Sequence, residues 1–209
     1  MMIRTLTATL CFCLALALPA FTDDKKPEKK KAPTGENFSN MDLTKMSFKE
    51  RNFKDNSTFE DSDCKGVSFF ECIAKQGVFA GADLTQADMR KADLTGADFR
   101  KAKLEFTNFS AAILTDANFE AADLSSAVFY VTTLRGANLR NLKGIDAAKY
   151  CKFQGADLRG ANLSKMVVGT TKDQHPNFTK ARYDKDTRWP AGFDPVDAGA
   201  VLVAEVIKK

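Results

Sequence analysis

The amino-acid sequence predicts an all-β solenoid, in which the chain winds into stacked four-sided coils. Two observations lead to this fold class. An apolar residue recurs at every fifth position, and a small residue, mostly Ala, stands two positions before most of these residues. Such an internal repeat is a stronger indication of fold than any other sequence signal. The unbroken series consists of Phe79, Leu84, Met89, Leu94, Phe99, Leu104, Phe109, Leu114, Phe119, Leu124, Phe129, Leu134 and Leu139.

A period of five fits neither a helix nor a straight strand. An α-helix would spread these residues around its circumference, and a strand would send successive ones to opposite faces, because five is odd. A chain that turns a corner every five residues points all of them inward. Four such sides close a coil of about twenty residues, and coils stack at roughly 4.8 Å.

Residues about twenty positions apart form four columns, in which two compositions alternate. The Phe-rich columns are Phe59, Phe79, Phe99, Phe119 and Leu139, and Phe69, Met89, Phe109 and Phe129. The other two are Cys64, Leu84, Leu104 and Leu124, and Ala74, Leu94, Leu114 and Leu134. This alternation predicts a four-sided coil in which two opposite walls carry rings that meet at the axis.

The repeat resembles that of the pentapeptide-repeat family, whose fold is a right-handed quadrilateral parallel β-helix. The resemblance covers residues 36–168 and implies about five to six coils of an exported bacterial member. One extra residue near 56–58 shifts the phase before Phe59, and the spacing breaks again after Leu139. Because the spacing from Phe129 to Phe153 exceeds one coil by four positions, we expect residues 142–150 to bulge out of the solenoid.

The segment before the repeats is expected to lie outside the fold. Residues 1–22 are predicted to be a signal peptide, because a basic start precedes the apolar stretch Leu6–Phe21. An uncleaved anchor is the alternative. Residues 23–35 are dense in charge and have no apolar residue larger than Ala or Pro, which favours a disordered linker. The mature protein is therefore expected to be periplasmic or secreted, without stable membrane insertion.

Three cysteines remain after the predicted signal peptide. Cys64 occupies a large inward position of the repeat, and Cys72 and Cys151 occupy small ones, so we expect buried free thiols, with a disulfide as the alternative. The sequence has no CxxC motif, and its only histidine is His175. Neither a metal nor another cofactor is therefore expected.

The sequence gives little support to catalysis. The repeat itself sets the positions of the aspartates, and the predicted stacking pairs them with cations, as in the outward column Asp83, Lys103 and Asp123. No Ser/His/acid set is assembled by spacing, and no glycine-rich phosphate loop is visible. The protein is expected not to be an enzyme.

Residues 169–209 are expected to form a C-terminal cap and tail. Tyr183, Trp189 and Phe193 are large rings placed where the repeat ends, and an open solenoid end must be covered. This segment also resembles the closing segment of many bacterial members of the family. A carbohydrate-binding role of Trp189 is the rival interpretation. Residues 197–209 are expected to form a short helix, or else a strand, that packs on the cap or provides a homodimer contact.

The charge balance bears on function. The resemblance implies DNA mimicry and topoisomerase binding for the best-understood members, which requires a strongly acidic rod, whereas residues 36–168 hold 18 acidic and 18 basic residues. Nucleic-acid binding is disfavoured for the same reason. We expect a non-catalytic, exported scaffold for an unidentified protein or cell-envelope partner. The candidate surface consists of outward apolar residues, with Phe70, Val128 and Tyr130 on one wall and Ile113 on the adjoining wall.

Overall fold

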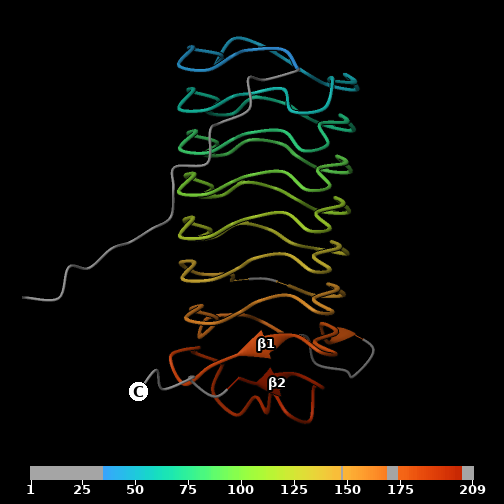
Figure 1. Ribbon diagram of the computed structural model, residues 1–209, viewed down its shortest axis with the longest axis vertical. Coiled ribbons are helices and arrows are strands. Elements are labelled where there is room, and N and C mark those ends of the chain that lie inside the picture. The colour runs from blue at the N-terminus through green and yellow to red at the C-terminus, as the bar shows by residue number, and fades with distance from the viewer. Residues whose placement is uncertain (1–34, 147, 169–173, 204–209) are drawn as a thin grey trace, which may run out of the picture. The chain divides into compact units, whose positions relative to one another are not determined.

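The computed structural model describes residues 35–146, 148–168 and 174–203. The predicted signal peptide and residues 23–34 of the predicted linker lie outside this part. The described chain winds into a stack of coils (Figure 1), and the parallel bridges give each coil four sides. Two regular strands, β1 (Arg182–Tyr183) and β2 (Val201–Leu202), pair in parallel, and the remaining rungs are isolated parallel bridges. The predicted all-β fold is confirmed.

The bridges define four walls, which we name A to D. Wall A begins at Asn37, wall B at Asp42, wall C at Ser47 and wall D at Asn52. The successive members of wall A are Asn37, Thr58, Val78, Asp98, Asn118, Asn138, Asp157, Arg182 and Val201. From Thr58 to Asn138 their spacing is constant at four pentapeptides, as the repeat predicts.

The core consists of the predicted columns. On wall A the rings of Phe59, Phe79, Phe99 and Phe119 stack face to face at centroid distances of 4.7, 4.9 and 4.9 Å. Phe109 of wall C meets Phe99 and Phe119 edge to face, at 5.9 Å in both cases. Aromatic pairs in these geometries contribute about 0.5–1.5 kcal/mol beyond the burial of their area. The aromatic columns on walls A and C thus meet at the axis.

The corners explain the Asp or Asn that precedes the large residue of each repeat. At one wall B corner, the Asp83 carboxylate accepts hydrogen bonds from the Thr85 amide and hydroxyl, at 3.2 and 2.7 Å. The next residue, Gln86, is left-handed with φ +61°, a conformation that such a turn stabilises. The polar residue therefore closes the corner, while its large neighbour turns inward.

Two coils between Asn37 and Asp157 depart from this regular length. The first is longer by one residue, since Asn37 pairs with Thr58, which confirms the extra residue near 56–58. The second departure contradicts the expected bulge. Thr133 pairs with Lys152, one position short of a full coil, so Phe153 lies next to Leu134 and not next to Phe129. The following side chains between 142 and 151 are fully or almost fully buried: Leu142, Ile145, Ala148 and Cys151.

The physical reason for this difference is burial. A bulge over 142–150 would have exposed Leu142 and Ile145 to water, whereas a turn shortened by one residue keeps both inside. Since burying a Leu or Ile side chain contributes about 1.5–3 kcal/mol, the short turn is the more stable solution.

The stack continues past residue 168. Asp157 pairs with Arg182, and Asn162 pairs with Arg188, so a further coil is added to the stack. Residues 169–173 lie outside the described part. The expected C-terminal helix is wrong for Val201–Leu202, which forms β2 against β1. The last coil presents unpaired backbone groups, and an added strand satisfies them. Residues 204–209 lie outside the described part.

Candidate functional site

The structure places the four residues of the candidate surface in two regions. Val128 and Tyr130 lie on wall C, and Ile113 lies past the adjoining corner, on wall D. Phe70 lies on wall C three coils closer to the N-terminus. It is half-buried, and three cations surround its ring, Lys49 at 5.6 Å, Arg90 at 5.3 Å and Lys91 at 5.2 Å. Phe70 is therefore separated from the other three residues.

Two further exposed residues join this surface, and the sequence reasoning missed both. Phe106 and Val131 occupy corner positions on either side of wall C, with φ +58° in each case. The exposed fractions are 59% for Phe106, 51% for Tyr130, 45% for Val131, 44% for Ile113 and 37% for Val128. We name these five residues, together with Asn108, the uncharged face.

The sequence does contain a signal for this face. Residues 106–115 and 124–134 are free of charged side chains, although 28% of the chain is charged. The bridges Asn108–Val128 and Ile113–Thr133 place these two segments on neighbouring coils. The Tyr130 and Tyr150 rings are perpendicular, with centroids 5.5 Å apart, so Tyr150 extends the surface towards the next coil. Single exposed apolar residues are ordinary on soluble proteins, whereas exposed apolar residues grouped on neighbouring coils are less so.

Charge is distributed unevenly along the stack. Residues 36–134 hold 16 acidic and 11 basic residues, whereas residues 135–168 hold 2 acidic and 7 basic ones. The uncharged face lies just before the basic segment. Lys149 and Lys152 on its C-terminal side have no ion pair within the described part of the chain.

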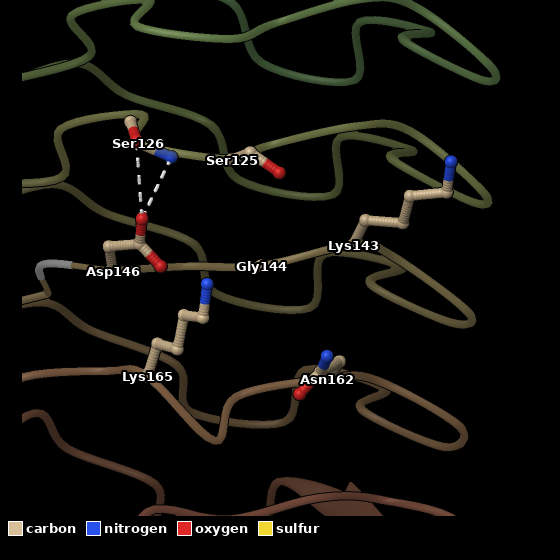
Figure 2. A pocket seen from close by; sticks show the side chains of 7 residues that line it. All are labelled: Ser125, Ser126, Lys143, Gly144, Asp146, Asn162 and Lys165. Atoms are coloured by element: carbon tan, nitrogen blue, oxygen red, sulfur yellow. Dashed lines mark hydrogen bonds between the residues drawn. The ribbon is translucent and has the colours of Figure 1, made fainter.

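A hollow of about 280 Å³ lies at the corner between walls B and C, next to the shortened turn. It is lined by Ser125, Ser126, Lys143, Gly144, Asp146, Asn162 and Lys165 (Figure 2). The Asp146 carboxylate accepts hydrogen bonds from the Ser126 amide and hydroxyl, at 3.0 and 3.3 Å. In Figure 2 the ammonium of Lys165 points towards the segment that carries Gly144 and Asp146.

The carboxylates whose pKa values are lowered accept structural hydrogen bonds, and Asp88 and Asp157 also form ion pairs. Hydrogen bonds from Arg90 hold the pKa of Asp88 below its ordinary value. Burial opposes ionisation of Asp157, yet hydrogen bonds from Arg159, together with the charge of Arg182, leave its pKa below the ordinary value. Both carboxylates therefore stay ionised, and their lone pairs are occupied by arginine.

The three thiols are buried and free, as the sequence predicts. Burial raises the pKa of Cys64 to about 11, and the pKa values of Cys72 and Cys151 to about 12. A thiol with such a pKa is almost entirely protonated at neutral pH and a poor nucleophile or metal ligand. In the described segments, no group of three or more His, Cys, Asp or Glu side chains is arranged to hold a metal ion.

The three rings of the expected cap lie together at the C-terminal end. Trp189 is half-buried and stacks on Phe193, with a centroid distance of 5.2 Å. Its ring meets the edges of Phe178 at 5.3 Å and Tyr183 at 5.6 Å. Phe178 is fully buried and belongs to the core, so the rings of Trp189 and Phe193 pack over the last part of the core.

Within residues 35–146, 148–168 and 174–203, the chain forms no helix with the length and apolarity that crossing a membrane requires.

Comparison with known proteins gives a family match and several similar solved structures. The family model described as pentapeptide repeats matches residues 62–100 and 102–141, in 8 copies. The chain is similar to a solved pentapeptide repeat protein of the Arabidopsis thaliana thylakoid lumen, with 28% identity over 52% of this chain and 72% of that one, and a TM-score of 0.33. A pentapeptide repeat protein of Nostoc also has 28% identity, over 60% of this chain and 84% of that one, with a TM-score of 0.34.

A third similar structure is QnrB1, a plasmid-mediated fluoroquinolone resistance protein. Its identity is 19% over 80% of this chain and 87% of that one, with a TM-score of 0.37. No curated protein matches the chain in sequence.

Proposed function

Because the chain belongs to the pentapeptide-repeat family, we propose that it is a non-catalytic interaction module that binds a protein partner through its uncharged face. The observation that carries this proposal is the contiguity of Phe106, Val128, Tyr130, Val131 and Ile113 on two neighbouring coils of a highly charged protein. An apolar centre within a charged rim is the usual anatomy of a protein interface.

Hydrogen bonds between coils fix the backbone beneath the uncharged face. The Phe109 and Val131 amides donate to carbonyls of the next coil, at 2.8 and 3.1 Å, and the Thr132 hydroxyl donates to the Phe109 carbonyl at 2.9 Å. A preorganised surface loses little backbone freedom on binding. The side chains of Tyr130 and Phe106 would act as anchors, since aromatic residues carry much of the energy of interfaces.

The residues that flank the uncharged face indicate the chemistry of the partner. Lys149 and Lys152 flank the face without an acidic neighbour in ion-pair distance among the described residues. A stable interface covers about 800 Å² on each partner, more than a few apolar side chains provide, so these lysines would also be covered. The partner would therefore present an apolar centre with carboxylates on one side.

Two other functions receive less support. DNA mimicry requires a polyanionic rod, whereas residues 36–168 hold equal numbers of acidic and basic residues. Carbohydrate stacking requires an open ring face, whereas Trp189 is half-buried and lies against Phe178, Tyr183 and Phe193. The arginine-bound carboxylates and protonated thiols also favour a non-catalytic role.

A double substitution tests the face. Tyr130→Ser with Val131→Ala gives wall C the residues of the preceding coil, Ser110 and Ala111, so the fold should tolerate it. The matched control is Arg100→Ser with Lys101→Ala, at the equivalent positions of wall A. A photo-crosslinker at Ile113 should capture the same partner with the wild type and the control, and at least tenfold less of it with the Tyr130 and Val131 variant. Equal capture by both double variants would refute the proposal.

Export forms a separate part of the proposal. It rests on the basic start and the apolar stretch Leu6–Phe21. Mass spectrometry of the native protein should show an N-terminus between Ala20 and Asp24. Full-length protein recovered from the cytoplasm would contradict export and leave the proposed interaction face untouched.

A further inference from the structure

We propose that the hollow beside Gly144 binds a singly charged oxyanion, a carboxylate or a sulfate ester. This site lies at the corner of walls B and C and is independent of the uncharged face. Its volume of about 280 Å³ is suited to one small anion or to one charged group of a larger ligand.

The shortened turn creates an amide donor at this place. In the preceding coils, the central residue of wall B donates its amide to the next coil, from Leu84 to Lys103, from Leu104 to Asp123 and from Leu124 to Lys143, each at 2.8 Å. The corresponding bond from Gly144 to Asn162 is missing from the described backbone. Gly144, which lines the hollow, therefore has an amide without the acceptor that the repeat normally supplies.

The charged side chains around the hollow leave one positive charge in excess. Lys143 and Lys165 line it together with a single carboxylate, that of Asp146. One oxygen of Asp146 accepts both bonds from Ser126. Lys165 forms no ion pair within the described residues, and Lys143 lies 3.7 Å from Asp123. Residues 135–168, to which the hollow largely belongs, also hold five more basic than acidic side chains.

These groups match one negative charge. The Lys165 ammonium and the Gly144 amide would donate to the oxyanion, and Lys143 would reach it after leaving its long contact with Asp123. The Asn162 carboxamide has its oxygen occupied by the Ser164 amide and hydroxyl, at 3.2 and 2.8 Å, so its NH₂ group remains as a donor. Charge-assisted bonds of this kind are stronger than those between neutral groups.

Nuclear magnetic resonance of the ¹⁵N-labelled mature chain tests the site. Sodium methyl sulfate and sodium acetate are titrated at constant ionic strength set with sodium chloride, and the amides of Gly144, Ser126 and Lys165 are followed. At least one of the two anions should give saturable shifts of these amides. Saturation by only one would identify the preferred group. Linear shifts with both would overturn the proposal.

Substitutions at matched positions locate the effect. Lys165→Gln should weaken binding at least tenfold, whereas Lys45→Gln, which occupies the same corner position of wall B in the first coil, should leave it unchanged. Lys143→Gln should weaken binding and Lys103→Gln, two coils before it in the same column, should not. Equal effects of Lys165→Gln and Lys45→Gln would also overturn the proposal.

Gly144→Ala tests the shape of the hollow. Its new Cβ would lie 3.5 Å from the Ser125 Cα and Oγ, which is ordinary contact, and 3.8 Å from an Asp146 oxygen. The backbone there has φ +59°, a conformation that Ala111 and Ala121 also adopt in this chain. The variant should therefore fold, with a spectrum like that of the wild type outside the hollow, and bind the anion more weakly. Undiminished binding would show that the anion does not occupy the space beside the Gly144 Cα and would count against this position of the site.

Discussion

The guanidinium carbon of Arg51 lies 5.0 Å from the centre of the Phe53 ring, at the N-terminal end of the solenoid. The same guanidinium lies 5.6 Å from Phe38 and 5.8 Å from Phe48, and it pairs with Glu36. Arg51 occupies a position that later coils fill with a small inward residue such as Ala92. In the first coil there is no preceding coil, so a long side chain has room to cover the core.

Replacing this covering residue should destabilise the first coil. Arg51→Ala removes three cation–ring contacts, each worth about 0.5–1 kcal/mol at exposed sites, and should lower the free energy of unfolding by about 1.5–3 kcal/mol. Urea denaturation of Arg51→Ala and of Lys101→Ala, an exposed corner variant, provides the measurement. Equal stability of the two variants would show that Arg51 does not stabilise the end of the stack.

The register of the coils predicts a strong contrast within one wall. Leu104 is fully buried between Leu84 and Leu124, so Leu104→Asp should unfold the solenoid or cost several kcal/mol. Lys101→Asp at an exposed corner should cost little, because a left-handed corner accepts Asp. Thermal denaturation compares the two, and similar melting temperatures would refute the register.

The short turn near Gly144 can be tested in the same way. Ala148 is fully buried in the structure, whereas a bulge over residues 142–150 would expose it. Ala148→Asp should therefore lower the free energy of unfolding by several kcal/mol, and Lys149→Asp should change it little. If Ala148→Asp were as stable as Lys149→Asp in urea, the bulge would be the better description.

Removal of the C-terminal cap should destabilise the last coil. A chain that ends after Asp184 loses β2 and the rings of Trp189 and Phe193, and burying such rings contributes about 1.5–3 kcal/mol each. Its melting temperature should fall, and light scattering should show end-to-end association through the uncovered edge. A truncated chain that stayed monomeric and equally stable, but lost binding to a glycan, would assign Trp189 to a binding site.

Stability should depend on pH through Asp157. Its pKa in the folded state lies below the unfolded value of about 3.9, so its ionised form stabilises the fold above that value. The contribution is lost as the pH falls through the folded pKa. Asp157→Asn should therefore lower the stability by about 1 kcal/mol at pH 7 and by less below about pH 4.

Chemical denaturation between pH 3 and pH 7 measures this dependence. Asp116→Asn serves as the control, because Asp116 is exposed and forms no ion pair in the described part of the chain. A difference between wild type and Asp157→Asn that stayed constant over this range would contradict the proposed role of the carboxylate.

The sequence by itself determined the interior of the solenoid. A period of five can point its large residues to one side only if the chain turns every five residues, so the Phe79 and Leu104 columns follow from local spacing alone. The buried thiols follow from the same rule. The outward residues Val128, Tyr130 and Ile113 could be identified because they break a polar pattern.

The tertiary structure decided whatever depends on contact between coils. Spacing along the chain left the segment after Leu139 ambiguous, and only the burial of Leu142 and Ile145 selected a turn one residue shorter than a regular coil. The hollow beside Gly144 lies next to that shortened turn. The joining of Phe106 and Val131 to the uncharged face, and the cations around Phe70, likewise arise between residues of different coils or walls. Packing of the whole stack fixes such relationships, and no local pattern contains them.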